Sequence, residues 1–276
     1  MSGLARGRYR IRFAASPEDV FAAQALRYRC FRAPRGDGSA PQAGEGSAAQ
    51  GGAAAEPQAA STESIDADDF DAKAAHVLVE ESDTGRLVCC FRLMHFRNGS
   101  EIASSYSAQF YELSALGRYE GPMLELGRFC IDPAAHGADV LRVAWGALAD
   151  YIDRHGIELL FGCSSFKGTE AEAYLDAFAV LKDRHIAPRR WLPRVKAPRV
   201  FRFARSLRLR KPNLKVGMRT MPPLLRTYLV MGGWVSDHAV VDGDLGTLHV
   251  FTGLEVNAVP SERARFFRAA KPLETA

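Results

Sequence analysis

Apolar side chains recur along this chain with the periods of strands and helices. Residues 9–13 alternate between apolar side chains and arginines, as expected of a half-buried strand. Ser16 then precedes a proline and two acidic residues, which predicts a helix that begins at Ser16 and reaches Phe31. Two apolar runs, 76–79 and 87–94, flank an Asp-Thr-Gly turn sequence and predict an antiparallel pair of strands.

The centre of the chain predicts a strand, a helix and a second strand in succession. Residues 123–133 are mostly apolar, and over 140–154 apolar residues recur every three or four positions, as one face of a helix requires. Residues 157–163 then form another apolar run, so the two strands are expected to be parallel. Segments 224–235 and 246–256 are expected to be extended or partly helical and to complete the sheet. The predicted fold class is α/β, with a mixed central sheet flanked by helices.

We expect one domain that is interrupted by an insertion. Residues 33–63 are rich in Ala, Gly, Ser, Pro and Gln, and such a composition cannot bury enough surface to offset the entropy lost on ordering. They are therefore predicted to be a disordered insertion. Residues 1–32 should supply the first strand and helix of the domain, 64–258 its remainder, and 259–276 a C-terminal tail.

The composition predicts the location of the protein in the cell, the state of its cysteines and whether it binds a metal. No window approaches 18 consecutive apolar residues, and no apolar run like a signal peptide follows the arginine-rich N-terminus, so a cytoplasmic location is expected. The five cysteines form no Cys-x-x-Cys pair and lie in apolar surroundings, which predicts reduced core thiols. The seven histidines lack the spacing of metal ligands, so no metal is expected.

Positive charge is concentrated in one segment. Between Lys182 and Arg219, 14 basic residues accompany a single acid, Asp183, which gives this segment a net charge of +13 in a chain of net charge +4. Such a segment suits an acidic protein, an anionic membrane surface or a nucleic acid. Arginines at intervals of three over 199–208 raise the alternative of a basic amphipathic helix on a membrane, which the neighbouring prolines would keep short.

Charged residues interrupt the apolar strand at 123–133. Glu125 and Arg128 stand three positions apart with a glycine between them, and a strand interior tolerates such residues only for a reason. Open α/β sheets bind ligands where such a strand ends and feeds a helix. The alternative is that the two side chains pair with each other or with partners on an exposed face. Ser164 and Ser165 are expected in the turn after the second parallel strand, level with this pair.

Further candidates lie earlier in the chain. Arg92 falls within the apolar run of a predicted strand, which distinguishes it from a routine surface arginine. Arg27 lies near the end of the first helix, where a cation also stabilises the helix dipole. Four acidic residues between Asp66 and Asp71 form either a solvated loop or an edge that binds an amine.

The predicted order of elements resembles that of the GNAT acyltransferase fold. Four segments also resemble the L-ornithine N-alpha-acyltransferases, which make lyso-ornithine lipid: YSAQF at 106–110, ELGRFCI at 125–131, FGCSSFKGT at 161–169 and PPLLRTYL at 222–229. This resemblance covers residues 20–32 and 64–253. The family is related to the acyl-homoserine lactone synthases, in which a similar Glu-x-x-Arg strand follows an acidic segment like 68–71. Both families use acyl carrier protein thioesters.

The resemblance implies a reaction and its partners. A 3-hydroxyacyl chain would move from acyl carrier protein to the α-amine of L-ornithine, with no bound cofactor and no nucleic acid. The basic segment would dock on the carrier protein, lie on the inner face of the membrane, or both. GNAT enzymes that use coenzyme A usually carry a Q/R-x-x-G-x-G/A loop after the central strand, whereas 133–141 contains only Gly137.

The resemblance and the chemistry of the residues together assign roles. The candidate catalytic residues are Glu125, Arg128 and Ser164, and the candidate substrate-binding residues are Arg27, Asp68, Asp71, Arg92, Phe129, Cys130 and Ile131. Glu125 would deprotonate the amine directly or through water. Arg128 and Arg92 would hold the acceptor carboxylate or only balance buried acids, and Asp68 and Asp71 would take its side-chain amine. Backbone N–H groups of 129–131 would meet the thioester carbonyl and pantetheine. Ser164 would protonate the leaving thiolate or only cap the next helix.

Two departures from the family leave alternatives open. The family usually has Cys-Asp-His where residues 74–76 read AAH, and Phe-Asn-Thr-Thr-Asp where 245–249 read LGTLH. If either of these acids binds the acceptor amino acid in the family, the acceptor of this chain is an amino acid other than ornithine. A lactone synthase acting on S-adenosylmethionine is a rival that segment 222–250 argues against. A silent GNAT-like binding module is another, and the intact pair of Glu125 and Arg128 argues against it.

Overall fold

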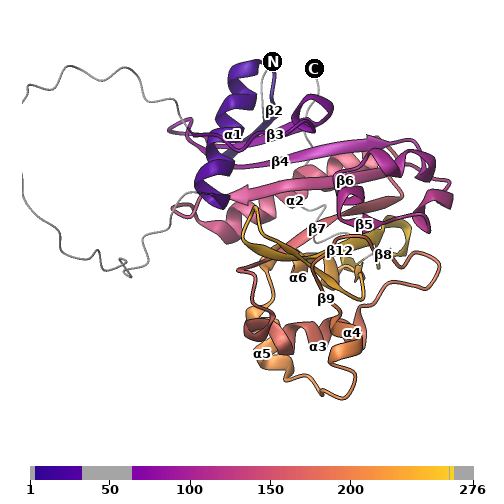
Figure 1. Ribbon diagram of the computed structural model, residues 1–276. Coiled ribbons are helices and arrows are strands. Elements are labelled where there is room, and N and C mark those ends of the chain that lie inside the picture. Colours follow the sequence, from indigo (N-terminus) through magenta and orange to yellow (C-terminus); the bar gives the residue numbers. More distant parts are fainter. Residues whose placement is uncertain (1–3, 33–63, 261, 264–276) are drawn as a thin grey trace, which may run out of the picture.

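The computed structural model describes residues 4–32, 64–260 and 262–263 (Figure 1). The predicted insertion at 33–63 and most of the predicted tail at 259–276 lie outside these residues, so both remain predictions. The predicted first strand and helix are confirmed, and the backbone N–H of Asp19 donates to Ser16 Oγ at 3.3 Å as an N-terminal cap.

Secondary structure in the described ranges comprises short and long strands, helices and single 3-10 turns. The strands are β1 (Leu4–Arg6), β2 (Tyr9–Phe13), β3 (Ala75–Glu81), β4 (Leu87–Phe96), β5 (Tyr111–Glu112), β6 (Met123–Ile131), β7 (Leu159–Lys167), β8 (Arg194–Val195), β9 (Val200–Phe201), β10 (Trp234–Val235), β11 (Ala239–Asp242) and β12 (Thr247–Glu255). The α-helices are α1 (Pro17–Phe31), α2 (Gly137–Arg154), α3 (Leu175–Arg184), α4 (Phe203–Ser206), α5 (Leu214–Thr220) and α6 (Pro223–Val230). The 3-10 turns that bear on the site are Asp71–Lys73, Gly99–Ser104, Ser107–Gln109 and Leu116–Arg118.

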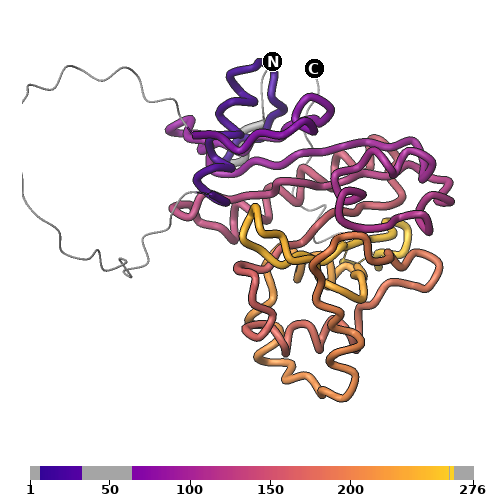
Figure 2. The backbone as a smooth tube through the Cα atoms, in the orientation of Figure 1, coloured from indigo at the N-terminus to yellow at the C-terminus, as the bar shows by residue number. Residues whose placement is uncertain are grey.

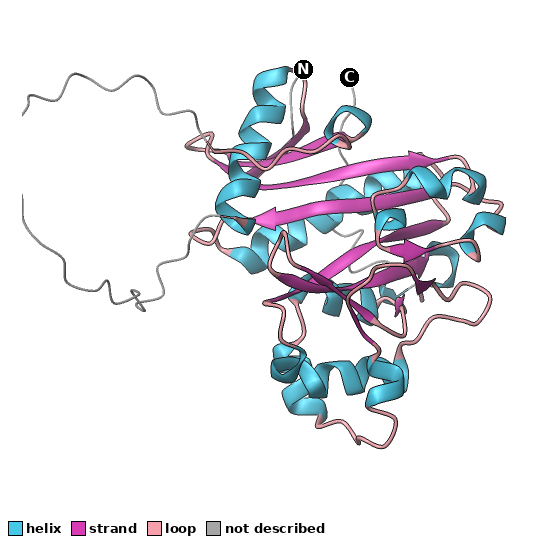
Figure 3. Ribbon diagram, viewed as in Figure 1, coloured by secondary structure: helices cyan, strands magenta, loops and turns pink. Residues whose placement is uncertain are grey.

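One mixed sheet organises the molecule (Figure 3). Its strands follow the order β1-β2-β3-β4-β6-β7-β12-β11-β9, with β10 also paired to β12. Strands β6 and β7 pair in parallel, and the other pairs described in this sheet are antiparallel. The strand-helix-strand prediction for the centre of the chain and the mixed α/β class are therefore confirmed.

Helices and turns cover the two faces of this sheet differently. Alternate residues of a strand point to opposite faces, and in β3 Val77 packs with the apolar side of α2 whereas Leu78 packs against Leu26 of α1. Helix α6 joins α2 on its face, and the turns between 99 and 118 join α1 on the other. The backbone trace shows α1 and these turns at opposite ends of their face (Figure 2). The surface between them is where the candidate site lies.

The basic segment 182–219 is not one amphipathic helix. It contains the end of α3, the strands β8 and β9 and the short helices α4 and α5, and its helices lie in the lower part of the view in Figure 1, whereas β8 lies higher, at the level of β12. Prolines at 188, 193, 198 and 212 interrupt it, and each lacks the N–H that a continuing helix needs. Over 199–208 the chain forms β9 and then the four-residue α4, so the arginines at intervals of three do not share one amphipathic helix, and the helix that is present is short, as the prolines predicted.

The turn predicted at Ser164 and Ser165 is also wrong. Strand β7 continues to Lys167 because Ser164 pairs with Val250 and Ser165 with His249 of β12. A strand from the far end of the chain thus extends the second parallel strand beyond its apolar run. The cysteine prediction is confirmed, since all five thiols are free and four of them are buried.

Candidate active site

The parallel strands β6 and β7 separate partway along their length. Their pairing runs from Met123 with Leu159 to Glu125 with Phe161 and ends there, although both strands continue for about six residues. At the point of separation a Cβ on Gly162 would lie 2.3 Å from the carbonyl oxygen of Leu126, so only glycine permits this approach. The backbone edges beyond this point face a cavity instead of each other.

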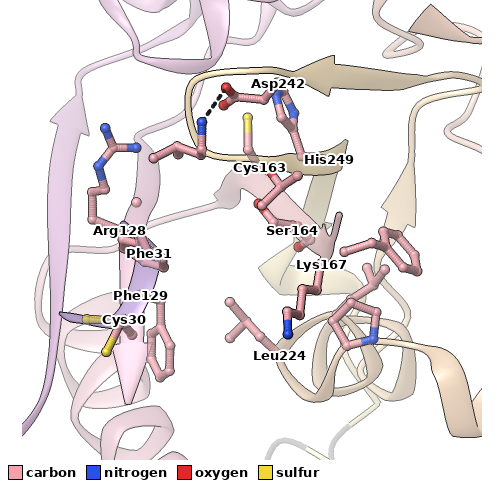
Figure 4. Close-up of a pocket in the computed structure, with 18 of the residues that line it drawn as sticks. Cys30, Phe31, Arg128, Phe129, Cys163, Ser164, Lys167, Leu224, Asp242 and His249 are labelled. Carbon is pink, nitrogen blue, oxygen red and sulfur yellow. Dashed lines mark hydrogen bonds between the residues drawn. The ribbon is translucent and has the colours of Figure 1, made fainter. Parts of the chain in front are cut away.

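A cavity of about 680 Å³ occupies the space between the separated strands. Its walls come from β6, β7, the start of α6 and the hairpin of β11 and β12 (Figure 4). A smaller cavity of about 190 Å³ adjoins it on the side of the acidic segment. The two share four wall residues, which are Tyr106, Arg128, Asp242 and Leu245. The site therefore has a large lobe and a small one that meet at these four residues.

A β-bulge in β6 aims Arg128 at this site. Residues three apart in a regular strand point to opposite faces, so Glu125 and Arg128 would be separated by the sheet. The register between β4 and β6 shifts at this position, and Arg128 adopts φ of 50°. The bulge turns Arg128 to the face of Glu125 and sends Phe129 to the other face, where it stacks on Phe91. A non-glycine residue in the left-handed region costs free energy and is typical of functional sites.

The Glu125 side chain is buried and accepts hydrogen bonds from the turn at Tyr106 and Ser107. Its side chain lines the large cavity, and the residue is 2% exposed. Oε2 accepts the N–H of Tyr106 at 2.8 Å, and Oε1 accepts the N–H and the hydroxyl of Ser107 at 2.7 and 2.5 Å. Burial raises the pKa of Glu125, and these hydrogen bonds and the charge of Arg92 partly oppose it. Glu125 does not pair with Arg128, so that alternative is wrong.

Arg128 instead joins a network of buried arginines and aspartates. Its Nη2 lies 3.0 Å from Asp68, its Nη1 donates to the hydroxyl of Tyr106 at 3.1 Å, and its Nε lies 2.9 Å from Asp66 without the alignment of a hydrogen bond. Arg92 binds both Asp68 and Asp71. The aspartates of the predicted acidic edge therefore form ion pairs with arginines, and the segment is not a solvated loop.

Arg27 completes this network from α1. It binds Asp66 at 3.0 Å and Asp71 at 2.6 Å, while Arg32 binds Asp66 at 2.7 Å. Burial opposes the ionised forms of Asp66 and Asp71, but the surrounding arginines outweigh it and lower both pKa values. The network ties α1 to segment 66–71 and to strands β4 and β6, and it keeps Arg128 in place.

The predicted site residues divide into those that line the cavities and those behind the wall. Glu125, Arg128, Ser164 and the three residues Phe129, Cys130 and Ile131 line the large cavity, and Asp68 lines the small one. Arg27, Asp71 and Arg92 line neither. Asp68 and Arg128 are therefore expected to contact a substrate directly. Arg27, Asp71 and Arg92 are expected to act only by holding these two side chains in position.

Ser164 and Cys163 present two different groups to the large cavity. Ser164 Oγ accepts the hydroxyl of Thr252 at 2.9 Å, which leaves its own proton available for donation. It caps no helix, because it lies within β7. Burial raises the pKa of Cys163 to about 12, so its thiol stays protonated and is a poor nucleophile. This disfavours a covalent acyl-cysteine and favours direct transfer.

Sequence reasoning missed several residues of the site. Tyr106 and Ser107 belong to the segment YSAQF, but no local pattern marks their backbone as a partner of Glu125. Asp242 and His249 reach the cavity from a hairpin far along the chain. In the part of the chain that the structure describes, no three His, Cys, Asp or Glu side chains converge as metal ligands would.

Comparisons with known proteins show what this chain is similar to. Residues 49–146 match the family model of the acetyltransferase (GNAT) domain. The L-ornithine N(alpha)-acyltransferase of Rhodobacter capsulatus is 31% identical over 94% of this chain and 94% of its own length, and that of Brucella abortus is 28% identical over 95% and 90%. The crystal structure of the acyl-homoserine lactone synthase LasI is 15% identical over 92% of this chain and 95% of its own, with a TM-score of 0.38 that is too low to carry an argument.

This level of identity over nearly the whole of both chains settles the family. The GNAT match adds that the chain is an acyltransferase. This chain belongs to the L-ornithine N(alpha)-acyltransferase family.

Proposed function

We propose that this chain transfers a 3-hydroxyacyl group from acyl carrier protein to the α-amine of L-ornithine and so makes lyso-ornithine lipid. The observation that carries the proposal is the 31% identity, over nearly the full length of both chains, to a relative named for acyl transfer to ornithine. The large cavity between the separated strands supports it, because its length along β6 and β7 suits a pantetheine arm and an acyl chain.

Acyl transfer from a thioester to an amine requires no covalent intermediate with the protein. The α-amine attacks the carbonyl carbon of the thioester, the C–N bond forms, the C–S bond breaks, and the thiol leaves with a proton. An α-amino group has a pKa of roughly 8, so freeing it of a proton near neutral pH costs only about 1–1.5 kcal/mol. Positioning of amine and carbonyl contributes roughly 7–11 kcal/mol and is the larger effect.

The wall residues have separate tasks in this reaction. Glu125 accepts the proton of the amine, directly or through water, at Oε2, which accepts a single hydrogen bond and retains a lone-pair site, whereas Oε1 already accepts two. Backbone N–H groups of 129–131 stabilise the oxyanion, and Ser164 protonates the leaving thiolate. Arg128 holds the acceptor carboxylate. No prosthetic group is needed, since the phosphopantetheine thioester arrives already activated.

A lipid analysis tests the proposed function. In a host that lacks ornithine lipids, expression of this chain is expected to produce a new mass that matches a 3-hydroxyacyl-ornithine, and the chain with Glu125→Ala is expected not to. The purified chain is expected to use acyl carrier protein thioesters in preference to the same acyl group on coenzyme A. A product on another amino acid would contradict the acceptor, and no acyl-amino acid at all would contradict the function.

We also propose that part of the basic segment 182–219 contacts the inner face of the membrane and the carrier protein. Helix α5 and the loop that joins it to α4 expose Lys211, Lys215 and Arg219, and the same loop carries Leu209, which is 85% exposed. Basic residues attract anionic lipids and acidic proteins, and an exposed leucine beside them suits the lipid interface. In the described ranges, no helix has the length and apolar character needed to cross a bilayer.

Two variants separate these partners. Leu209→Asp is expected to lower binding to anionic vesicles severalfold and to leave the KM for acyl carrier protein unchanged, because only a lipid surface takes up the leucine. Lys211→Glu combined with Lys215→Glu is expected to weaken vesicle binding about tenfold or more and to raise that KM. Co-sedimentation with anionic and neutral vesicles measures the first effect. Equal binding to both kinds of vesicle, unaffected by the variants, would contradict the membrane contact.

A further inference from the structure

Asp242 is a buried carboxylate at the edge of the small cavity. It ends β11 and is 7% exposed. Its Oδ1 accepts the backbone N–H groups of Asp244 and Leu245, both at 3.0 Å, which fixes the side chain at the start of the turn to β12. Its orientation is thus set by the hairpin and not by a ligand.

This carboxylate has no positive partner among the described residues. Asp66, Asp68 and Asp71 each lie within 3.0 Å of at least one arginine, whereas no arginine, lysine or histidine in the described part of the chain comes within ion-pair distance of Asp242. A buried charge without a counter-charge is costly. Arginines thus balance Asp66, Asp68 and Asp71, whereas Asp242 is left without such a partner.

Asp242 and Arg128 lie on opposite walls of the site. Both line the large and the small cavity, and Figure 4 shows Arg128 on β6 facing the hairpin that carries Asp242 and His249. His249 is also more than nine-tenths buried on this wall, and its Nε2 has no hydrogen-bond partner. A small molecule with a negative group at one end and a positive group at the other matches this arrangement of charges.

We propose that Asp242 binds the side-chain ammonium group of the acceptor amino acid, while Arg128 binds its carboxylate. The inference rests on the proposed function and adds the residue that selects the acceptor. The ion pair completes the charge balance of Asp242, so the site favours amino acids with a short cationic side chain over isosteres that end in a methyl group. An analogue without the ammonium leaves the carboxylate unpaired in the cavity, and such a site rejects it strongly.

The test compares ornithine with norvaline, whose side chain has the same three carbons as that of ornithine but lacks the terminal ammonium group. Asp242→Asn keeps an oxygen for the two backbone N–H groups and removes the charge. Its KM for ornithine is expected to rise about ten- to a hundredfold, its KM for the acyl donor to stay unchanged, and its preference for ornithine over norvaline to fall by a similar factor. Asp237→Asn is the matched control, because Asp237 lies shortly before β11 and lines neither cavity. If Asp242→Asn fails to fold, Asp242→Ser carries the same test, since a serine hydroxyl also accepts N–H groups in such turns.

The outcomes separate this inference from the proposed function. If the wild-type chain acylates ornithine and Asp242→Asn retains both its KM and its preference, the inference is wrong and the function stands. If the wild-type chain acylates no amino acid, the function fails and the inference fails with it. Calorimetric titration with ornithine and norvaline alone, in the absence of donor, gives a second readout. Binding of ornithine that depends on Asp242 supports the inference, and equal binding of both amino acids overturns it.

Discussion

Replacing Glu125 by alanine is expected to lower kcat/KM for acyl transfer about hundredfold or more. Loss of a general base alone costs about that much. The change also leaves the N–H groups of Tyr106 and Ser107 without their acceptor in a buried place, at about 1–3 kcal/mol each. Steady-state kinetics with an acyl carrier protein thioester measure the effect, and circular dichroism verifies that the variant folds.

A second variant separates the chemical role of Glu125 from its structural role. Ser107→Ala removes the hydroxyl that donates to Oε1 and keeps the backbone N–H. Since this hydrogen bond lowers the pKa of Glu125, its loss raises that pKa further. A base must be deprotonated, so the acidic limb of the pH profile of kcat/KM is expected to move to higher pH in Ser107→Ala. A limb that stays in place would show that Glu125 only anchors the turn.

Replacing Arg27 by methionine is expected to lower the free energy of unfolding by about 3–5 kcal/mol. The Arg27 side chain is fully buried and binds Asp66 and Asp71. Removal of one partner leaves buried carboxylates with too little positive charge, which costs far more than the loss of a surface pair. Urea unfolding measures the change, and the melting temperature should fall by about 10 °C.

Arg97→Ala provides the matched control, because Arg97 is exposed and pairs with Glu101. Its effect on stability is expected to stay within about 0.5 kcal/mol. The difference between wild type and Arg27→Met should also depend on pH. The pKa values of Asp66 and Asp71 are lowered in the folded chain, so the stability they contribute is present above about pH 4 and is lost as the pH falls through their folded-state values. If Arg27→Met is as stable as the wild type at neutral pH, the network does not hold α1 to segment 66–71.

The local pattern of apolar residues was enough to predict the strand-helix-strand unit at the centre of the fold. Apolar periodicity over 140–154 and the apolar runs before and after it predicted a helix between two strands, and chain connectivity then required the strands to be parallel. A glutamate and an arginine in an apolar strand also marked the site, because charge in such a place is costly unless it has a use. These inferences depend only on residues that are close in sequence.

The arrangement of the site depended on contacts between distant segments. Pairing with β12 decided that Ser164 lies in a strand, and a bulge decided that Arg128 shares a face with Glu125. Asp242 reaches the cavity from a hairpin more than a hundred residues away from Glu125. The sequence by itself determined the fold class and the strand that carries the chemistry, since these follow from local periodicity and from charge in an apolar run, and its resemblance to known sequences indicated the family. Only the tertiary structure decided which buried charges form ion pairs and which carboxylate is left for a ligand. The reason is that these side chains come from α1, segment 66–71, β4, β6 and β11, which only folding brings together.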